Sequence, residues 1–92
     1  MRVPLLAVVL LTAPASALAD ITCTAAAPAT WLSQSQFRAD IKARGYQITK
    51  FKVTPGNCYE IYGFDAQKRP VEIYHDPVTG RPMKYERIKR PS

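Results

Sequence analysis

The sequence predicts an α+β domain in which one N-terminal helix packs on a three- to four-stranded antiparallel meander. One segment with helix-capping residues precedes several segments rich in β-branched and aromatic residues, and short turns containing Pro, Gly, Asn or Asp separate them. The helical segment has a narrow apolar face, so it needs a sheet to bury that face. Two cysteines provide a candidate disulfide for a chain too short to build a large core.

The first 19 residues are typical of a cleaved export signal. Arg2 supplies the positive charge, residues 5–11 are apolar, and residues 17–19 read Ala-Leu-Ala, a cleavage pattern. A membrane anchor is the alternative, but a spanning helix needs roughly 20 apolar residues. Pro14 and Ser16 interrupt this run. We therefore expect a protein exported to the periplasm or secreted beyond it, with 73 of the 92 residues left to fold.

Cys23 and Cys58 are the only cysteines and would emerge in an oxidising compartment. A bridge between them would close a loop of 36 residues, worth about 3.8 kcal/mol of chain entropy. Acylation of Cys23 is disfavoured because Asp20, Ile21 and Thr22 precede it. A redox-active pair or a metal site would be expected to use a CxxC pattern, which neither cysteine has. A structural disulfide is the favoured interpretation.

Residues 20–30 are small and predict an extended arm, after which the folded domain begins at residue 31. Ser33 with Gln36 three positions later forms a capping box, which starts a helix. Gly45 ends the helix in the left-handed conformation that helix ends favour. Its buried stripe consists of two residues four positions apart, Phe37 and Ile41.

The expected strands follow the helix directly. The apolar spacing of the first strand slips near Thr49 and Lys50, which indicates a β-bulge. The fourth strand is the weakest, and the domain is expected to end at residue 85, followed by a basic tail over residues 86–92. The four strands are expected at residues 46–53, 58–64, 70–74 and 83–85.

Alternation along the strands sorts the side chains onto two faces. The face toward the helix should carry Tyr59, Ile61, Val71 and Ile73. The opposite face, here called the outer face, should carry Glu60, Tyr62, Phe64, Glu72 and Tyr74. A cluster of exposed aromatic side chains usually has a partner or a cover. Either the arm with Trp31 folds over the outer face, or this face binds a partner.

Several motifs resemble the PepSY domain family, in its short single-domain periplasmic members. They are Asn-Cys-Tyr-Glu-Ile-Tyr-Gly-Phe-Asp at 57–65, Val-Glu-Ile-Tyr at 71–74 and Asp-Pro-Val-Thr-Gly at 76–80. Trp31, the capped helix and the Gly-Tyr pair at 45–46 fit the same pattern, and pairing of the two cysteines is similar to a recurrent family feature. The resemblance covers roughly residues 23–83. It departs at residues 66–70, where family members often have Asp and Gly.

The resemblance implies a small binding or regulatory module of the cell envelope. Inhibition or local control of peptidases has been proposed for such domains, and no catalytic residues are implied. The partner would be a periplasmic or membrane protein, or a peptide. We expect the protein to act as a monomer.

Catalysis, cofactors and metal binding are not predicted. His75, the only histidine, stands beside Asp76 at a strand end, and too few ligands converge there for a metal site. A chain of this length also offers little cleft for a catalytic base. Glu60 and Glu72 are reminiscent of paired catalytic carboxylates, but solvent exposure is the favoured interpretation. Their expected partners are nearby cations: Lys50, Lys52 or Arg69.

The charge balance leaves one alternative function. Without the signal, twelve basic and seven acidic residues remain, and five of the basic residues lie between Arg81 and Arg90. Such a tail predicts either simple solubility or affinity for anionic lipid or lipopolysaccharide surfaces. Nucleic acid is excluded as a partner by the compartment and by the lack of a binding motif.

Overall fold

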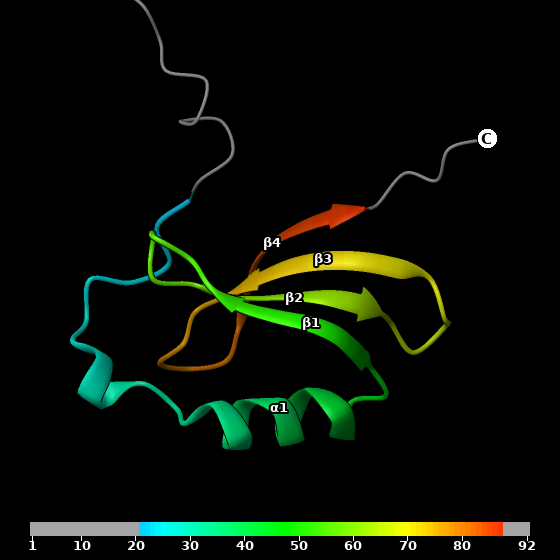
Figure 1. Ribbon diagram of the computed structural model, residues 1–92, viewed down its shortest axis with the longest axis horizontal. Coiled ribbons are helices and arrows are strands. Elements are labelled where there is room, and N and C mark those ends of the chain that lie inside the picture. Colours follow the sequence, from blue (N-terminus) through cyan, green and yellow to red (C-terminus); the bar gives the residue numbers. More distant parts are fainter. Residues whose placement is uncertain (1–20, 88–92) are drawn as a thin grey trace, which may run out of the picture.

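The computed structural model describes residues 21–87, so the predicted export signal and residues 88–92 of the tail lie outside the described part. The described chain contains helix α1 (Gln34–Ala43), then β1 (Gln47–Val53), β2 (Tyr59–Phe64), β3 (Pro70–His75) and β4 (Pro82–Arg87). The strands form one antiparallel sheet in the order β1-β2-β3-β4, and α1 lies along one side of it (Figure 1). The predicted α+β fold is confirmed. Between residues 21 and 87, no helix is long and apolar enough to cross a bilayer.

Both ends of α1 follow from local residues. Ser33 caps the helix by accepting a hydrogen bond from the Gln36 N–H at 3.0 Å. The Gln36 side chain does not return this bond as a capping box requires, because its amide donates to Asp40 Oδ1 at 2.9 Å. Gly45 follows the helix with φ of +92°, as the sequence predicted.

Phe37 and Ile41 are buried against the sheet and define the core. The four residues predicted for the helix-facing side of the sheet all join them: Tyr59, Ile61, Val71 and Ile73. The Phe37 ring lies 5.0 Å from the Tyr59 ring and 5.8 Å from the Phe51 ring, measured between centroids. The predicted sorting of side chains between the two faces is therefore confirmed.

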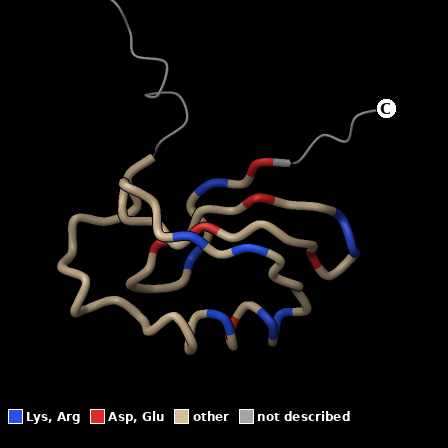
Figure 2. The backbone as a smooth tube through the Cα atoms, viewed as in Figure 1, with Lys and Arg blue, Asp and Glu red and all other residues tan. Residues whose placement is uncertain are grey.

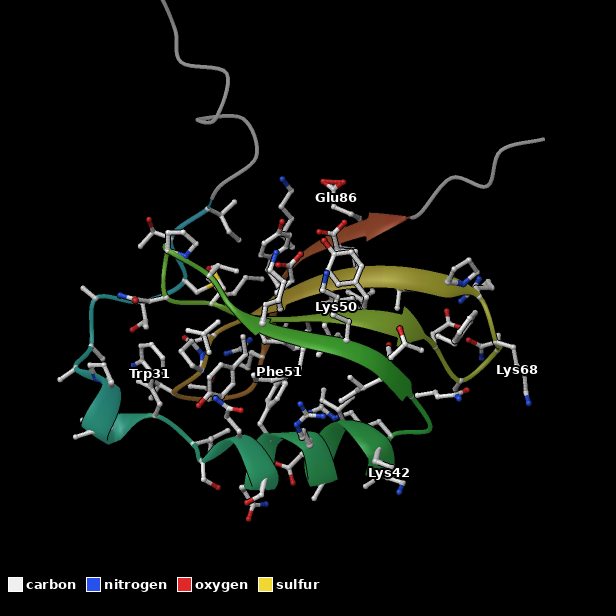
Figure 3. All side chains as sticks on the ribbon, in the orientation of Figure 1. Trp31, Lys42, Lys50, Phe51, Lys68 and Glu86 are labelled. Atoms are coloured by element: carbon white, nitrogen blue, oxygen red, sulfur yellow. A yellow bond between two sulfur atoms is a disulfide. The ribbon has the colours of Figure 1, made fainter. Side chains whose placement is uncertain are left out.

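The β1–β2 register contains the predicted bulge, between Ile48 and Lys50. The bulge sends Lys50 to the outer face and Phe51 toward α1 (Figure 3). Opposite Ile48 lies Gly63, where any Cβ atom would collide with the carbonyl group of Gln47. Glycine is thus required at this position of β2.

The end of the domain differs from the prediction. Strand β4 continues through Glu86 and Arg87, because β3 offers Glu72 and Val71 as pairing partners for them. The predicted boundary at residue 85 is therefore two residues too early.

The departure from the family pattern at residues 66–70 leaves the β2–β3 hairpin intact. The Asp65 carboxylate accepts hydrogen bonds from the N–H groups of Gln67 and Arg69, both at 2.9 Å. Lys68 takes the left-handed conformation, with φ of +66°. Phe64 then pairs with Pro70 in an unbroken register.

The predicted disulfide is present and joins Cys23 to Cys58, with a Cα–Cα distance of 5.0 Å. The Cys23 N–H also donates to the Gly56 carbonyl at 2.9 Å, so the arm is held at the β1–β2 turn. The arm is not extended throughout, because a short 3-10 helix spans Pro28–Thr30. Beyond it, the Trp31 ring packs edge-on against Tyr59, on the helix side of the sheet.

Candidate functional site

Strand pairing brings the predicted outer-face residues together. On β2 and β3, Glu60 lies opposite Tyr74 and Tyr62 lies opposite Glu72. Phe64 stands at the end of this row, opposite Pro70. Trp31 does not cover the cluster, because its ring packs against Tyr59 on the other side of the sheet.

Cations and one further carboxylate surround this cluster. Lys50 and Lys52 on β1 pair with Tyr62 and Glu60, respectively. Lys84 and Glu86 on β4 pair with Tyr74 and Glu72. These two β4 residues were not predicted for the outer face, although alternation with Met83 and Tyr85 would have assigned them to it.

Glu60 is buried, with 2% of its surface exposed, so the prediction of a solvent-facing carboxylate is wrong. The reason is its place on a central strand, between the long side chains of Lys52 and Tyr74 on the neighbouring strands. Its Oε2 atom is buried and has no hydrogen-bond partner within residues 21–87.

Within residues 21–87, neither Glu60 nor Glu72 forms an ion pair, so the predicted pairs with Lys50, Lys52 or Arg69 are absent there. The Arg69 guanidinium binds Asp65 at 2.9 Å and takes no part in the cluster. Lys50 places its Nζ atom 5.5 Å from the centre of the Tyr62 ring. Lys52 is the cation that favours ionisation of both Glu60 and Glu72.

Glu60 and Glu72 behave as a coupled pair of carboxyl groups. Burial raises the pKa of Glu60 to about 7, and hydrogen bonding to Glu72 together with the charge of Glu72 acts in the same direction. The hydrogen bond from Glu60 lowers the pKa of Glu72, which therefore carries the negative charge of the pair. Just below pH 7 the pair therefore holds one proton, mainly on Glu60.

Two tyrosines complete the hydrogen-bonded cluster. The Tyr74 hydroxyl donates to Glu72 Oε2 at 3.2 Å. Burial raises the pKa of Tyr62 to about 12 and also raises the pKa of Tyr74, so both hydroxyls stay protonated. The outer face thus combines the buried carboxyl group of Glu60 with the Glu72 carboxylate and two tyrosine hydroxyls.

His75 lies on the other side of the sheet, so the structure does not unite it with Glu60 and Glu72. Its ring is buried against Phe37, at a centroid distance of 4.9 Å, and Nδ1 lies 3.2 Å from the Tyr59 carbonyl oxygen. Burial lowers the pKa of His75 to about 4. The residue ends β3, as predicted, and it is a buried core residue.

The surface around the cluster is too open to enclose a substrate for catalysis. Two cavities stand out on the described surface, with volumes of about 210 and 600 Å³, and neither is lined by Glu60 or Glu72. Over residues 21–87, no group of three or more His, Cys, Asp or Glu side chains is placed to hold a metal ion. The cluster lies instead on an open sheet face, which is the geometry of a contact surface.

The shared proton should be visible in the pH dependence of stability. The folded pKa of Glu60, about 7, exceeds its ordinary value of 4.5, so its stabilising contribution is lost as pH rises between these values. The folded pKa of His75, about 4, lies below its ordinary 6.5, so its contribution is lost as pH falls through that window. Each contribution amounts to about 3 kcal/mol at most. In the wild-type protein we expect the two to oppose each other and the profile to be shallow.

Glu60→Gln separates the two contributions. The free energy of unfolding is measured by urea titration at several pH values. The value for Glu60→Gln should increase relative to that of the wild type as pH rises from about 4.5 to 7. Glu86→Gln, which changes a more exposed carboxylate on the same face, is the control and should leave the profile unchanged. Parallel profiles for Glu60→Gln and the wild type would contradict the shared proton.

Comparison with known proteins agrees with the motifs. A family model described as peptidase propeptide and YPEB domain matches residues 3–86, nearly the whole chain. No curated protein and no solved structure matches the chain. The match supports a small regulatory module of the peptidase-propeptide kind. Motifs, fold and family model agree, and the chain belongs to the PepSY family of peptidase propeptide and YPEB domains.

Proposed function

We propose that this protein is a small regulatory module of the bacterial cell envelope that binds a peptidase or a membrane-protein partner through its outer face. It performs no catalysis of its own, and its export follows from the signal at residues 1–19. The observation that carries the proposal is the buried Glu60 beside the half-buried Glu72, placed with Tyr62 and Tyr74 on a sheet face opposite α1.

The fold does not need the Glu60–Glu72 pair for its stability. A buried carboxyl group with an unpartnered oxygen costs free energy, and an apolar side chain would suit the same position on β2. Tyr62 and Tyr74 are half-buried. They combine apolar area with a hydroxyl, as residues at the centre of interfaces commonly do.

Lysines form a rim around this centre. Lys50 lies over the Tyr62 ring, and Lys84 Nζ lies 6.0 Å from the centre of the Tyr74 ring. A partially buried aromatic centre with a charged rim is the usual anatomy of a protein interface. A partner that donates hydrogen bonds to Glu72 fits the centre best, because the carboxylate there accepts.

The test is recovery of a partner from envelope extract with the oxidised protein as bait. Tyr62→Ser combined with Tyr74→Ser should reduce recovery at least tenfold while the melting temperature stays within a few degrees. Tyr85→Ser is the matched control, because Tyr85 is an exposed tyrosine on the opposite face of the same sheet. Undiminished recovery, or a collapse of stability in the double variant, would remove the outer face from the functional account.

The basic tail supports a second candidate, binding to anionic lipid or lipopolysaccharide. Its support is the five basic residues between Arg81 and Arg90, the last of which lie outside the described residues. Binding of this kind should weaken steeply from low to moderate salt. Salt-sensitive binding to anionic vesicles that survives the double tyrosine substitution would favour this candidate over the first.

A further inference from the structure

Strand β1 is an edge of the sheet and leaves one side of its backbone open. It pairs with β2 alone, and among residues 21–87 no segment pairs with its other side. Every second residue of an edge strand directs its N–H and C=O away from the sheet, where another strand can add. Five of the seven residues of β1 are exposed.

A groove runs beside this open edge. Its volume is about 600 Å³, and it lies where α1 adjoins the start of β1. Arg38 and Lys42, one helical turn apart, contribute its charges. Tyr46, Gln47 and Ile48 contribute the remaining lining. Such a groove can receive side chains of a strand that pairs with β1.

The charge along this side of the molecule is positive. Among residues 21–87, the two ion pairs are Arg69–Asp65 and Lys84–Glu86, and neither involves a cation of α1 or β1. Asp40, the one acid on α1, accepts from Gln36. Figure 2 shows basic segments on α1 and β1, the two elements that border the groove. The cations are Arg38, Lys42, Arg44, Lys50 and Lys52.

The same positive charges disfavour pairing of β1 with the β1 strand of a second copy of this chain. Antiparallel pairing of two β1 strands would bring the lysines Lys50 and Lys52 of the two copies near one another, and like charges across strands are destabilising. Lysines and a bulge are common devices that keep an edge strand from aggregating. An acidic strand would turn this repulsion into attraction.

We propose that the open edge of β1 and the adjoining groove bind an extended acidic segment of a partner protein, which adds to the sheet as a fifth strand. Backbone hydrogen bonds to β1 provide the contact, as in other cases of strand addition. Acidic side chains on one face of the segment meet Lys50 and Lys52, and those on the other meet Arg38 and Lys42. An anionic membrane would satisfy the charges but not the open backbone groups. The open backbone edge and the groove are distinct from the tyrosine centre, although Lys50 and Lys52 border both. The proposal therefore goes beyond the function proposed above.

Synthetic peptides test the two requirements separately on the oxidised protein. The probe is a fluorescent peptide of roughly ten residues that repeats Glu-Glu-Thr-Thr, so that as a strand it carries acidic side chains on both faces. One comparison peptide replaces Glu by Lys, which tests charge. Another keeps the sequence but carries N-methyl groups on alternate amides along one edge, and a third carries them along the other edge. Together they test backbone pairing.

We expect the acidic peptide to bind and the Lys peptide not to bind. One of the two N-methylated peptides should lose binding at least tenfold, because only one edge faces β1. Hydrogen exchange should slow at outward-facing amides of β1 when the acidic peptide is present. Arg38→Glu with Lys42→Glu should weaken binding at least tenfold. Lys68→Glu with Arg81→Glu, the same charge change at exposed sites elsewhere, should weaken it far less.

Several results would overturn the proposal. Equal binding of the acidic peptide and both methylated forms would show attraction by charge alone. Protection of β4 rather than β1 amides would place the strand at the wrong edge. An absence of binding, or binding to anionic vesicles with no peptide binding, would also reject it. Because the peptide comparisons use the wild-type protein, they decide the matter even if a charge-reversal variant folds poorly.

Discussion

Replacing Ile61 by Ala is expected to lower the free energy of unfolding by about 2–5 kcal/mol. Ile61 is fully buried on the central strand β2, between Phe51 on β1 and Ile73 on β3, and its side chain joins the core beneath α1. Small domains are stable by only about 5 kcal/mol or less, so the variant should be largely unfolded or close to it. Urea titration followed by fluorescence of Trp31, the only tryptophan, measures the loss.

Two companion variants make this result interpretable. Ile61→Val removes one methylene group and should cost about 1 kcal/mol, since it leaves a smaller cavity. Tyr62→Ala, one residue along on the outer face, should cost less than Ile61→Ala because Tyr62 is only half-buried. A larger loss for Tyr62→Ala than for Ile61→Ala would mean that the two faces of the sheet are assigned in reverse.

Loss of the Cys23–Cys58 disulfide is expected to cost about 2–5 kcal/mol. The bridge spans a sequence separation of 35 and ties the arm to the start of β2, where Cys58 is fully buried. Without the bridge the unfolded chain gains conformational freedom, and the arm keeps hydrogen bonds to the β1–β2 turn such as those from the Cys23 N–H to the Gly56 carbonyl and from Asn57 to the Thr24 carbonyl. Cys23→Ala with Cys58→Ala tests this loss without leaving a buried free thiol, and thermal unfolding measures it.

The wild-type protein under reducing conditions is the matched comparison for the double variant. Both should show lower melting temperatures than the oxidised protein, together with a change in the emission of Trp31, whose contact with Tyr59 depends on the position of the arm. Two free thiols in protein isolated from the cell envelope would contradict a native bridge. A melting temperature within a degree or two of the oxidised protein would contradict its contribution to stability.

The pH experiment and the partner experiment address the same cluster in different ways. If the Glu60–Glu72 pair serves only the fold, removing its shared proton changes stability and nothing else. If it serves recognition, Glu60→Gln should also change partner recovery, although the variant should lose less stability than the wild type as pH rises to 7. A gain in stability accompanied by a loss of binding would identify the pair as retained for function.

Much of this fold could be predicted because the relevant interactions are local. The cap at Ser33 and the stop at Gly45 depend on residues within a few positions of each other, so a short segment is enough to recognise them. The side of the sheet on which Ile61 and Tyr62 lie follows from strict alternation. The disulfide follows from counting, because two cysteines allow one internal bridge.

The depth at which a residue lies was decided by the tertiary structure. Alternation places Glu60 on the outer face, but its burial depends on Lys52 and Tyr74, which strand register brings to either side of it from distant parts of the chain. In the same way, only the β3–β4 register brings Glu86 opposite Glu72. Only the path of the arm decides that Trp31 packs against Tyr59 and leaves the outer face open. The sequence by itself determined the elements and the faces, because these depend on neighbours along the chain, whereas the proton shared by Glu60 and Glu72 depends on neighbours across the sheet.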